Sequence, residues 1–225
     1  MSKILISGCG LSWSKQERST WTKVIRLCGV DIDDQAGPAI SNQLILTSMI
    51  QAVMENDYSQ AVCQLTSTEK LDVEVNNDSR KDLVAKDPIR NFTHKGYWPS
   101  SVSQNHDSKK MFYEYLYSPT LEQQDTVFKW MLLQKLCAEK GIKLHTILGY
   151  KINWMEGVQK DLILTDHNWN IYDYYTNGEY WKLHDHSLGE KNTVPNKYFQ
   201  IHLAKKINNE MLKLPINEKL ERFHD

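Results

Sequence analysis

The first 65 residues alternate between short apolar runs and segments with helical spacing, and this alternation strongly constrains the fold. Ile4-Leu5-Ile6 has the form of a buried parallel strand, which ends at the glycine turn Ser7-Gly8-Cys9-Gly10. Residues 19–27 begin with a Ser/Thr cap and continue with apolar side chains at helical spacing, which predicts a helix. Gly29 ends this helix. Val30-Asp31-Ile32 then predicts a short second strand.

A second helix and a third strand complete this pattern. Ser41-Asn42 is a natural N-cap, and the apolar residues that follow it form one helical face, namely Leu44, Ile45, Met49, Ile50 and Val53. Residues 61–65 predict the third strand. Strands that alternate with helices imply right-handed crossovers and a parallel sheet covered on both faces, so the predicted fold class is α/β.

Regular spacing is lost from Thr66 to Tyr117 and returns at Leu121. We interpret residues 66–118 as an insertion over one end of the sheet, within a single domain of residues 1–225. The next segment predicts an amphipathic helix closed by Gly141, in which Phe128, Met131, Leu132, Lys135 and Leu136 recur at helical spacing. Residues 142–148 alternate as a fourth strand, and residues 196–212 predict a terminal helix with Tyr198, Ile201, Ala204, Ile207 and Met211 inward.

Composition limits the function classes. Lys and Arg total 27 against 28 Asp and Glu, so bulk charge does not indicate binding to nucleic acid or to acidic membranes. No stretch approaches the roughly 18 apolar residues of a membrane span, and the N-terminal apolar run is too short for a signal peptide. The four cysteines lie far apart without a C-x-x-C pair, which favours reduced thiols and a cytoplasmic location.

Three polar clusters follow the first three strands. They are residues 7–12, residues 37–42 and Thr66-Ser67-Thr68-Glu69. Loops at the carboxyl ends of parallel strands meet at one edge of the sheet, where ligands bind. Backbone amides beside glycines, hydroxyl groups and an amide side chain suit an oxyanion or a phosphate, whereas the alternative is that these residues only form turns and caps.

These clusters also carry a family resemblance. Gly-Cys-Gly-Leu-Ser at residues 8–12, Gly-Pro-Ala-Ile-Ser-Asn-Gln at residues 37–43, the third cluster, and Pro195-Asn196 before a helix with His202 and Ala204 occur in this order. The order resembles the SGNH/GDSL hydrolase superfamily, and more narrowly the divergent SGNH-like proteins of marine bacteriophages. The resemblance implies a three-layer α/β/α sandwich with a mostly parallel five-stranded sheet. It also implies ester hydrolysis by a Ser nucleophile and a His base, in the host cytoplasm if the protein is phage-encoded.

The positions that match the family's catalytic residues carry other side chains. Aligning Gly8 with the family's first glycine puts Gly10 at the nucleophile, so the candidate nucleophile is Ser12. Val194 occupies the position of the catalytic His, and an alternative alignment uses His186 as the base with Asp185 to orient or stabilise it. The resemblance assigns the remaining contacts to a ligand or oxyanion: Gly8, Cys9, Gly10, Gly37, Asn42, Thr66 and Ser67.

Several function hypotheses remain open. The first is an SGNH-like hydrolase with a degenerate triad, acting on an ester or acyl group of a carbohydrate or small metabolite. The second is a non-hydrolytic binding or accessory protein on the same fold, and the third is a transferase that uses the glycine turn for an anionic donor. The eight aromatic residues between Tyr150 and Trp181 suit a glycan or a nucleotide, or else they pack a loop-rich cap. We expect no metal, since His184 and His186 lack a third ligand nearby, and no cofactor.

Overall fold

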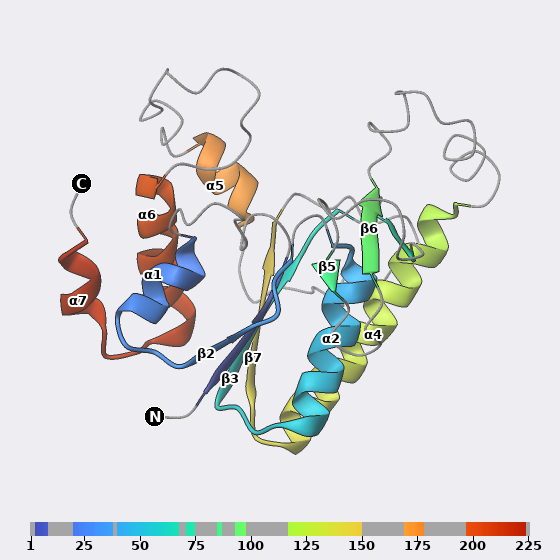
Figure 1. Ribbon diagram of the computed structural model, residues 1–225, viewed down its shortest axis with the longest axis horizontal. Helices are drawn as coiled ribbons and strands as arrows, with labels where there is room; N and C mark the ends of the chain where they lie inside the picture. The colour runs from blue at the N-terminus through green and yellow to red at the C-terminus, as the bar shows by residue number, and fades with distance from the viewer. Residues whose placement is uncertain are drawn as a thin grey trace.

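The computed structural model describes nine ranges of the chain: residues 3–8, 20–37, 40–67, 71–74, 85–86, 93–97, 117–149, 169–177 and 197–223. Together these ranges form an α/β fold with a four-stranded parallel sheet (Figure 1).

The parallel sheet has the strand order β2-β1-β3-β7. Its strands are β1 (Ile4–Ser7), β2 (Ile32–Asp34), β3 (Gln60–Leu65) and β7 (Lys143–Leu148). All four strands of the sequence prediction are present, although β2 begins two residues later than expected. Leu148 also forms an isolated parallel bridge to Asn170 on the outer side of β7.

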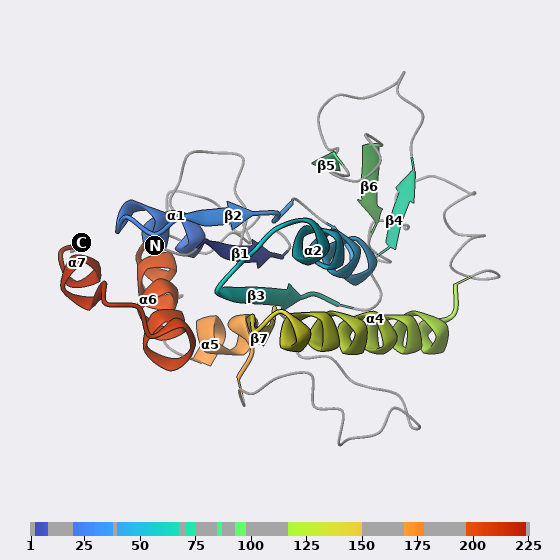
Figure 2. The ribbon, with the colours of Figure 1, turned by 90° about the horizontal axis from the view of Figure 1, so that it is seen from below.

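Helices cover both faces of this sheet (Figures 1 and 2). One face packs against α1 (Trp21–Leu27) and α6 (Lys197–Ile207), and the other face packs against α2 (Asn42–Glu55) and α4 (Pro119–Glu139). The shorter elements are α5 (Ile171–Asn177), the π-helical turn η4 (Asn208–Leu212) and α7 (Asn217–Glu221).

Alternate residues of each strand enter one of two hydrophobic cores. Ile4 and Ile6 lie in the core with α1 and α6, whereas Leu5 lies in the core with α2 and α4. Both sets of side chains are almost completely buried. This explains why β1 has a continuous apolar sequence, since a parallel strand covered on both faces has no polar side.

The helix ends follow from local side chains. Thr20, Ser41 and Ser118 each cap a helix by accepting a hydrogen bond from a backbone N–H of the first turn. Gly29 and Gly141 have φ angles of 89° and 68°, the left-handed conformation that glycine adopts most easily after a helix.

The helix predicted for this segment is confirmed as α4, and Leu136 packs against the core, but the other apolar residues that predicted the helix do not. Phe128, Met131 and Leu132 are exposed, whereas the buried side of the helix consists of Gln123, Thr126, Val127, Trp130, Leu133 and Cys137. Trp130 fixes this orientation, because its Nε1 donates a hydrogen bond of 2.9 Å to Oγ1 of Thr146 on β7. The helix is thus apolar on two sides, and periodicity alone did not identify the side that packs on the sheet.

The terminal helix prediction was largely correct. Residues 197–212 are helical, and Ile201, Ala204, Ile207 and Met211 are buried, whereas the side chain of Tyr198 lies outside the described part of the chain. The sequence did not indicate the final π-helical turn, which ends at Lys213 with a φ angle of 50°.

The predicted insertion contains regular structure that its sequence did not reveal. Its strands β4 (Leu71–Glu74), β5 (Ala85–Lys86) and β6 (Thr93–Tyr97) form an antiparallel sheet of order β4-β6-β5. Strand β4 contacts α2, and the small sheet lies near the end of the molecule where α2 begins (Figures 1 and 2). These strands are too short to give a clear alternating pattern.

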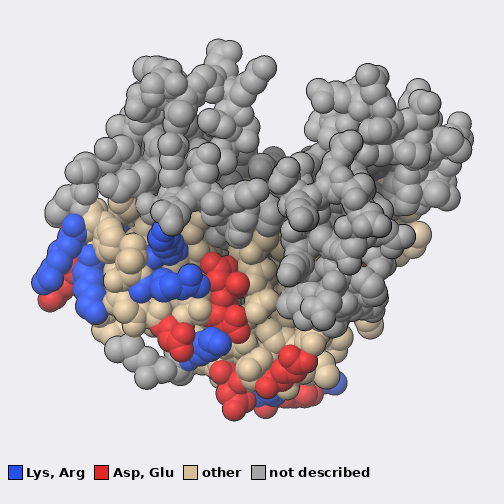
Figure 3. Space-filling model, viewed as in Figure 1, with Lys and Arg blue, Asp and Glu red and all other residues tan. Residues whose placement is uncertain are grey.

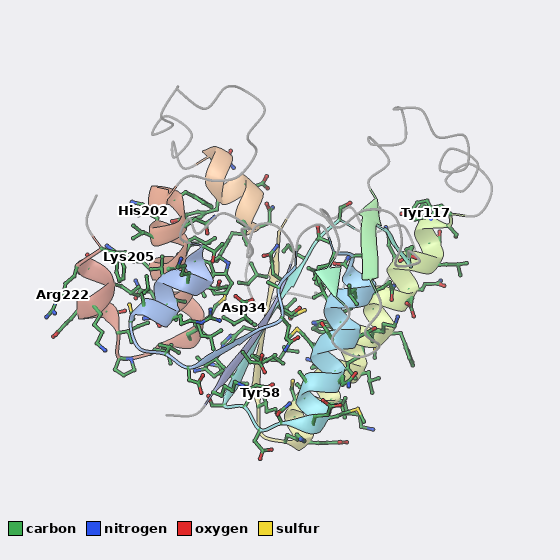
Figure 4. All side chains as sticks on the ribbon, in the orientation of Figure 1. Asp34, Tyr58, Tyr117, His202, Lys205 and Arg222 are labelled. Carbon is green, nitrogen blue, oxygen red and sulfur yellow. The ribbon has the colours of Figure 1, made fainter. Side chains whose placement is uncertain are left out.

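Charged residues are unevenly distributed on the face shown in Figure 3. Lys and Arg gather over α6 and α7, where Figure 4 places Lys205 and Arg222, and acidic residues lie over the lower part of this face. Lys205 is paired with Glu221 at 2.9 Å. Within the described part of the chain, no helix is long and apolar enough to cross a membrane.

Candidate functional site

The strand order defines a candidate site between the carboxyl ends of β1 and β3. From β1 the chain pairs with β2 on one side and then with β3 on the other, so the order reverses between β1 and β3. Loops diverge at such a switch point, and open α/β sheets bind ligands there. Gly8 follows β1 at this point, Thr66 follows β3, and α2 begins beside Thr66.

Asn42 joins the start of α2 to the end of β3. Its Nδ2 donates to the carbonyl oxygen of Thr66 at 3.0 Å, and its Oδ1 accepts from the backbone N–H of Thr66 at 2.7 Å. Both residues are buried. A primary amide has two N–H donors, so the second Nδ2–H is the donor that an oxyanion role would use.

The loops after β1 and β2 are also joined. The backbone N–H of Gly37 donates to the carbonyl oxygen of Gly8 at 3.0 Å, and that of Gln35 donates to Ile6 at 2.7 Å. Ser7 Oγ donates a longer hydrogen bond of 3.4 Å to the carbonyl oxygen of Gln35. The structure therefore brings two predicted ligand-binding glycines together, with the Gly37 amide already used to hold the two loops.

The hydroxyl group of Thr66 is the unsatisfied polar group at this edge. Thr66 is completely buried, and its Oγ1 has no hydrogen-bond partner among the described residues. Leaving a buried hydroxyl group unpaired costs roughly 1–3 kcal/mol, which a ligand oxygen at this position would offset. Ser67 follows it and is half-buried.

A polar network links the first turn of α2 to α4. Gln43 donates to Glu122 Oε2 at 3.2 Å and accepts a short hydrogen bond from Lys129. Lys129 is also paired with Asp125 at 2.8 Å. These bonds add to the two that Asn42 makes, so the beginning of α2 is fixed from both sides.

The sequence analysis missed Asp34, which lies at the carboxyl end of β2. Its Oδ1 accepts a hydrogen bond of 3.0 Å from the backbone N–H of Ala36, so it shapes the loop that leads to Gly37. Burial raises the pKa of this carboxyl group, although hydrogen bonds from Ala36 and Thr22 act in the opposite direction. The sequence does contain a signal for Asp34, because this carboxylate stands at the end of a strand and shortly before Gly37.

Its neighbour Asp33 has the opposite environment. Burial raises its pKa, but hydrogen bonds from Tyr58 and Gln35 and the charge of Lys3 outweigh that effect, so the pKa lies below its usual value. Tyr58 donates the shortest of these bonds, 2.6 Å from its hydroxyl to Oδ2 of Asp33. Burial and Asp33 together raise the pKa of Tyr58.

The two histidines with described side chains lie elsewhere. His145 Nε2 is 3.0 Å from Oε1 of Gln60, the first residue of β3, and Gln60 in turn donates to the carbonyl oxygen of Leu212. His202 is exposed on α6, away from α2 (Figure 4). His145 pairs in register with Val62, three residues before the end of β3.

The structure thus brings together part of the predicted site. Gly8 contacts Gly37, Asn42 contacts Thr66, and Ser67 continues the third loop. The remaining predicted site residues lie outside the described residues, and they are Cys9, Gly10, Ser12, Asp185 and His186. In the ranges that are described, no group of three or more His, Cys, Asp or Glu side chains is arranged to hold a metal ion.

Comparison with known protein families, with curated proteins and with solved structures finds no match to this chain.

Proposed function

We propose that this protein is an SGNH-like hydrolase that acts on an ester or acyl group of a carbohydrate or small metabolite. One observation carries the proposal: at the switch point of a parallel sheet, Asn42 is held against Thr66, whose buried hydroxyl group has no partner among the described residues. Hydrogen-bond donors fixed before a ligand arrives stabilise a developing oxyanion without reorganisation.

The sheet supports the finer architecture that we propose, a three-layer sandwich with five parallel strands. Helices pack on both faces, and Asn170 forms a parallel bridge to Leu148 at the position where a fifth strand would join β7. Residues 169–170 would then belong to the edge of the sheet beside the aromatic-rich segment of residues 150–181.

In the proposed reaction, Ser12 Oγ attacks the carbonyl carbon of the ester while His186 takes the hydroxyl proton. The tetrahedral oxyanion collapses to an acyl-enzyme, and His186 returns the proton to the departing alkoxide. Water then attacks the acyl-enzyme with the same histidine as base, which releases the acid and regenerates Ser12. Asp185 stabilises the imidazolium, and the second Nδ2–H of Asn42 and the Thr66 hydroxyl donate to the oxyanion.

Turnover of a panel of short-chain p-nitrophenyl esters tests this proposal. We expect Ser12→Ala and His186→Ala each to lower kcat/KM by at least about 1000-fold. The matched control is His202→Ala, which removes an exposed imidazole on α6 and should leave kcat/KM unchanged. Activity that survives Ser12→Ala would contradict the assigned nucleophile.

A second candidate function is ligand binding without hydrolysis. The observation that favours it is that N–H groups predicted to bind the ligand already donate hydrogen bonds within the protein. The Gly37 N–H donates to Gly8, and one Asn42 N–H donates to Thr66. Glycine also stands at the position aligned with the family's nucleophile, Gly10.

Thermal shift measurements separate the two candidates. Acetylated sugars, sulfate and nucleotides are added to the natural protein and to Thr66→Val, which is close in shape but lacks the hydroxyl group. A ligand at 100 times its Kd stabilises the folded state by about 2.7 kcal/mol, a readily measured rise in Tm. A rise that Thr66→Val abolishes, without turnover of any ester, favours binding alone, and a nucleotide or sulfate as the active ligand favours a transferase with an anionic donor.

A further inference from the structure

The outer side of α4 carries an exposed apolar stripe. It consists of Leu121, Phe128, Met131 and Leu132, which are 65%, 68%, 46% and 40% exposed. Leu121, Phe128 and Leu132 recur after seven and then four residues, the spacing that puts side chains on one line along a helix. We refer to these four residues as the α4 stripe.

The α4 stripe lies on a helix that already has a complete inner contact. The opposite side of α4 packs on α2 and β7 through Trp130, Leu133 and Cys137. Helices that are apolar on all sides are normally buried, and a row of large exposed apolar side chains marks an interaction surface. Polar residues alone would suffice on this outer side if it faced only water.

Charges beside the α4 stripe indicate what covers it. Asp125 lies in the N-terminal half of the helix and Lys135 in its C-terminal half, and their side chains are 46% and 75% exposed. Glu122, Lys129 and Lys140 instead bond to α2 or to the residue that follows it. An antiparallel copy of the same helix would place Asp125 opposite the partner's Lys135, and it would oppose the two helix dipoles favourably. A parallel copy would place like charges together.

The positions of these residues are symmetric along the helix. Phe128 and Leu132 lie two residues before and after Trp130, and Asp125 and Lys135 lie five residues before and after it. A two-fold axis at the level of Trp130 therefore sets Phe128 against the partner's Leu132 and Asp125 against the partner's Lys135. Such a self-complementary surface is what a symmetric dimer requires.

We propose that the α4 stripe is the contact surface for a second copy of this chain, which docks as an antiparallel pair of α4 helices. The proposal is independent of the hydrolase assignment, because the stripe lies on the side of α4 opposite to the sheet. The partner supplies the same apolar residues and the complementary charges.

Sedimentation velocity of the full chain across a range of concentrations tests this proposal. We expect twice the mass of the 26.3 kDa chain at high concentration. Phe128→Glu should raise the dimer dissociation constant at least about tenfold, since large side chains at the centre of an interface carry most of its affinity. The matched control is Leu27→Glu, which changes a 61% exposed apolar residue on α1, at the other face of the sheet, and should leave the dissociation constant unchanged.

A charge exchange tests the antiparallel arrangement separately. Asp125→Lys and Lys135→Asp should each weaken the dimer, because each puts like charges opposite one another, and the double variant should restore it. Circular dichroism checks that all variants remain folded. A natural protein that stays monomeric at every concentration would overturn the proposal, as would equal effects of Phe128→Glu and Leu27→Glu or a double variant no better than the single ones.

Discussion

The side-chain amide of Asn42 forms two hydrogen bonds with the backbone of Thr66, one as donor at 3.0 Å and one as acceptor at 2.7 Å. The two residues are 24 positions apart in the chain, yet they join the first turn of α2 to the residue that directly follows β3. The arrangement satisfies both backbone groups of a buried residue, and it fixes the position of the Thr66 hydroxyl group, which has no partner among the described residues.

Replacement of Asn42 should destabilise the protein strongly. Asn42→Ala leaves the buried N–H and C=O of Thr66 unpaired, so we expect the free energy of unfolding to fall by about 2 kcal/mol or more. Urea denaturation measures the change. The control is Gln51→Ala on the same helix, which removes an exposed hydrogen bond to Glu55 and should change stability by less than about 0.5 kcal/mol. Equal effects of both substitutions would show that the Asn42 bonds contribute little.

Asp33 and Asp34 should respond to pH in opposite directions. The pKa of Asp33 is lowered on folding, so its ionised form stabilises the native state above the unfolded pKa of about 3.9. This contribution is lost as pH falls through the lower folded pKa. The stability advantage of the natural protein over Asp33→Asn should therefore shrink below about pH 4.

For Asp34 the pKa is raised by burial, and the sign reverses. Its contribution is complete below about pH 3.9 and is lost as pH rises through the higher folded pKa. The stability of the natural protein relative to Asp34→Asn should therefore decline as pH rises above about 4. Unfolding curves for both variants between about pH 2 and pH 7 check these predictions, and parallel curves for the two variants would contradict them.

The hydrogen bond between Trp130 and Thr146 should show measurable coupling. Trp130→Phe leaves the Thr146 hydroxyl group buried and unpaired, and Thr146→Val does the same to the indole N–H if the ring stays in place. Each change should cost about 1–3 kcal/mol, and the double variant should cost less than the sum because neither partner is then left unpaired. Additive costs in the double-mutant cycle would exclude a contribution from this bond.

Buried thiols should be unreactive in the native protein. Cys28, Cys63 and Cys137 are free and buried, and burial raises the pKa of each, to about 11 for Cys137. At pH 8 about one Cys137 group in a thousand would be thiolate, the form that reacts. Titration with a disulfide reagent should detect at most one of the four thiols in native protein and all four after unfolding. Rapid reaction of two or more native thiols would contradict the buried positions.

The amino-acid sequence predicts the sheet well because its strands are covered on both faces. Continuous apolar runs such as Ile4-Leu5-Ile6 cannot fit a half-exposed strand, and the glycines and caps between them mark the ends of the helices. The small antiparallel sheet was missed because β5 has only two residues and β4 has four, too few for periodicity to appear.

The side of α4 that packs was not predictable for a different reason. Phe128 and Leu132 are as apolar as Trp130 and Leu133, so two faces of the helix compete, and only contacts with α2 and β7 decide between them. The site was predicted in part, because strand order determines which loops meet. The partners of Asn42 were not predictable, since nothing local in the sequence relates it to Thr66.

Residues 66–142 connect two neighbouring strands, β3 and β7, and α4 is the element of this connection that covers the sheet. The entropy of closing a chain loop grows only logarithmically with its length, so doubling a loop costs only about 0.6 kcal/mol. Lengthening, shortening or exchanging the segment between Thr66 and Tyr117 should therefore change the free energy of folding little, provided that its ends still meet beside α2. This chain can accordingly acquire a different segment between β3 and α4 while β1, β3 and β7 keep their register.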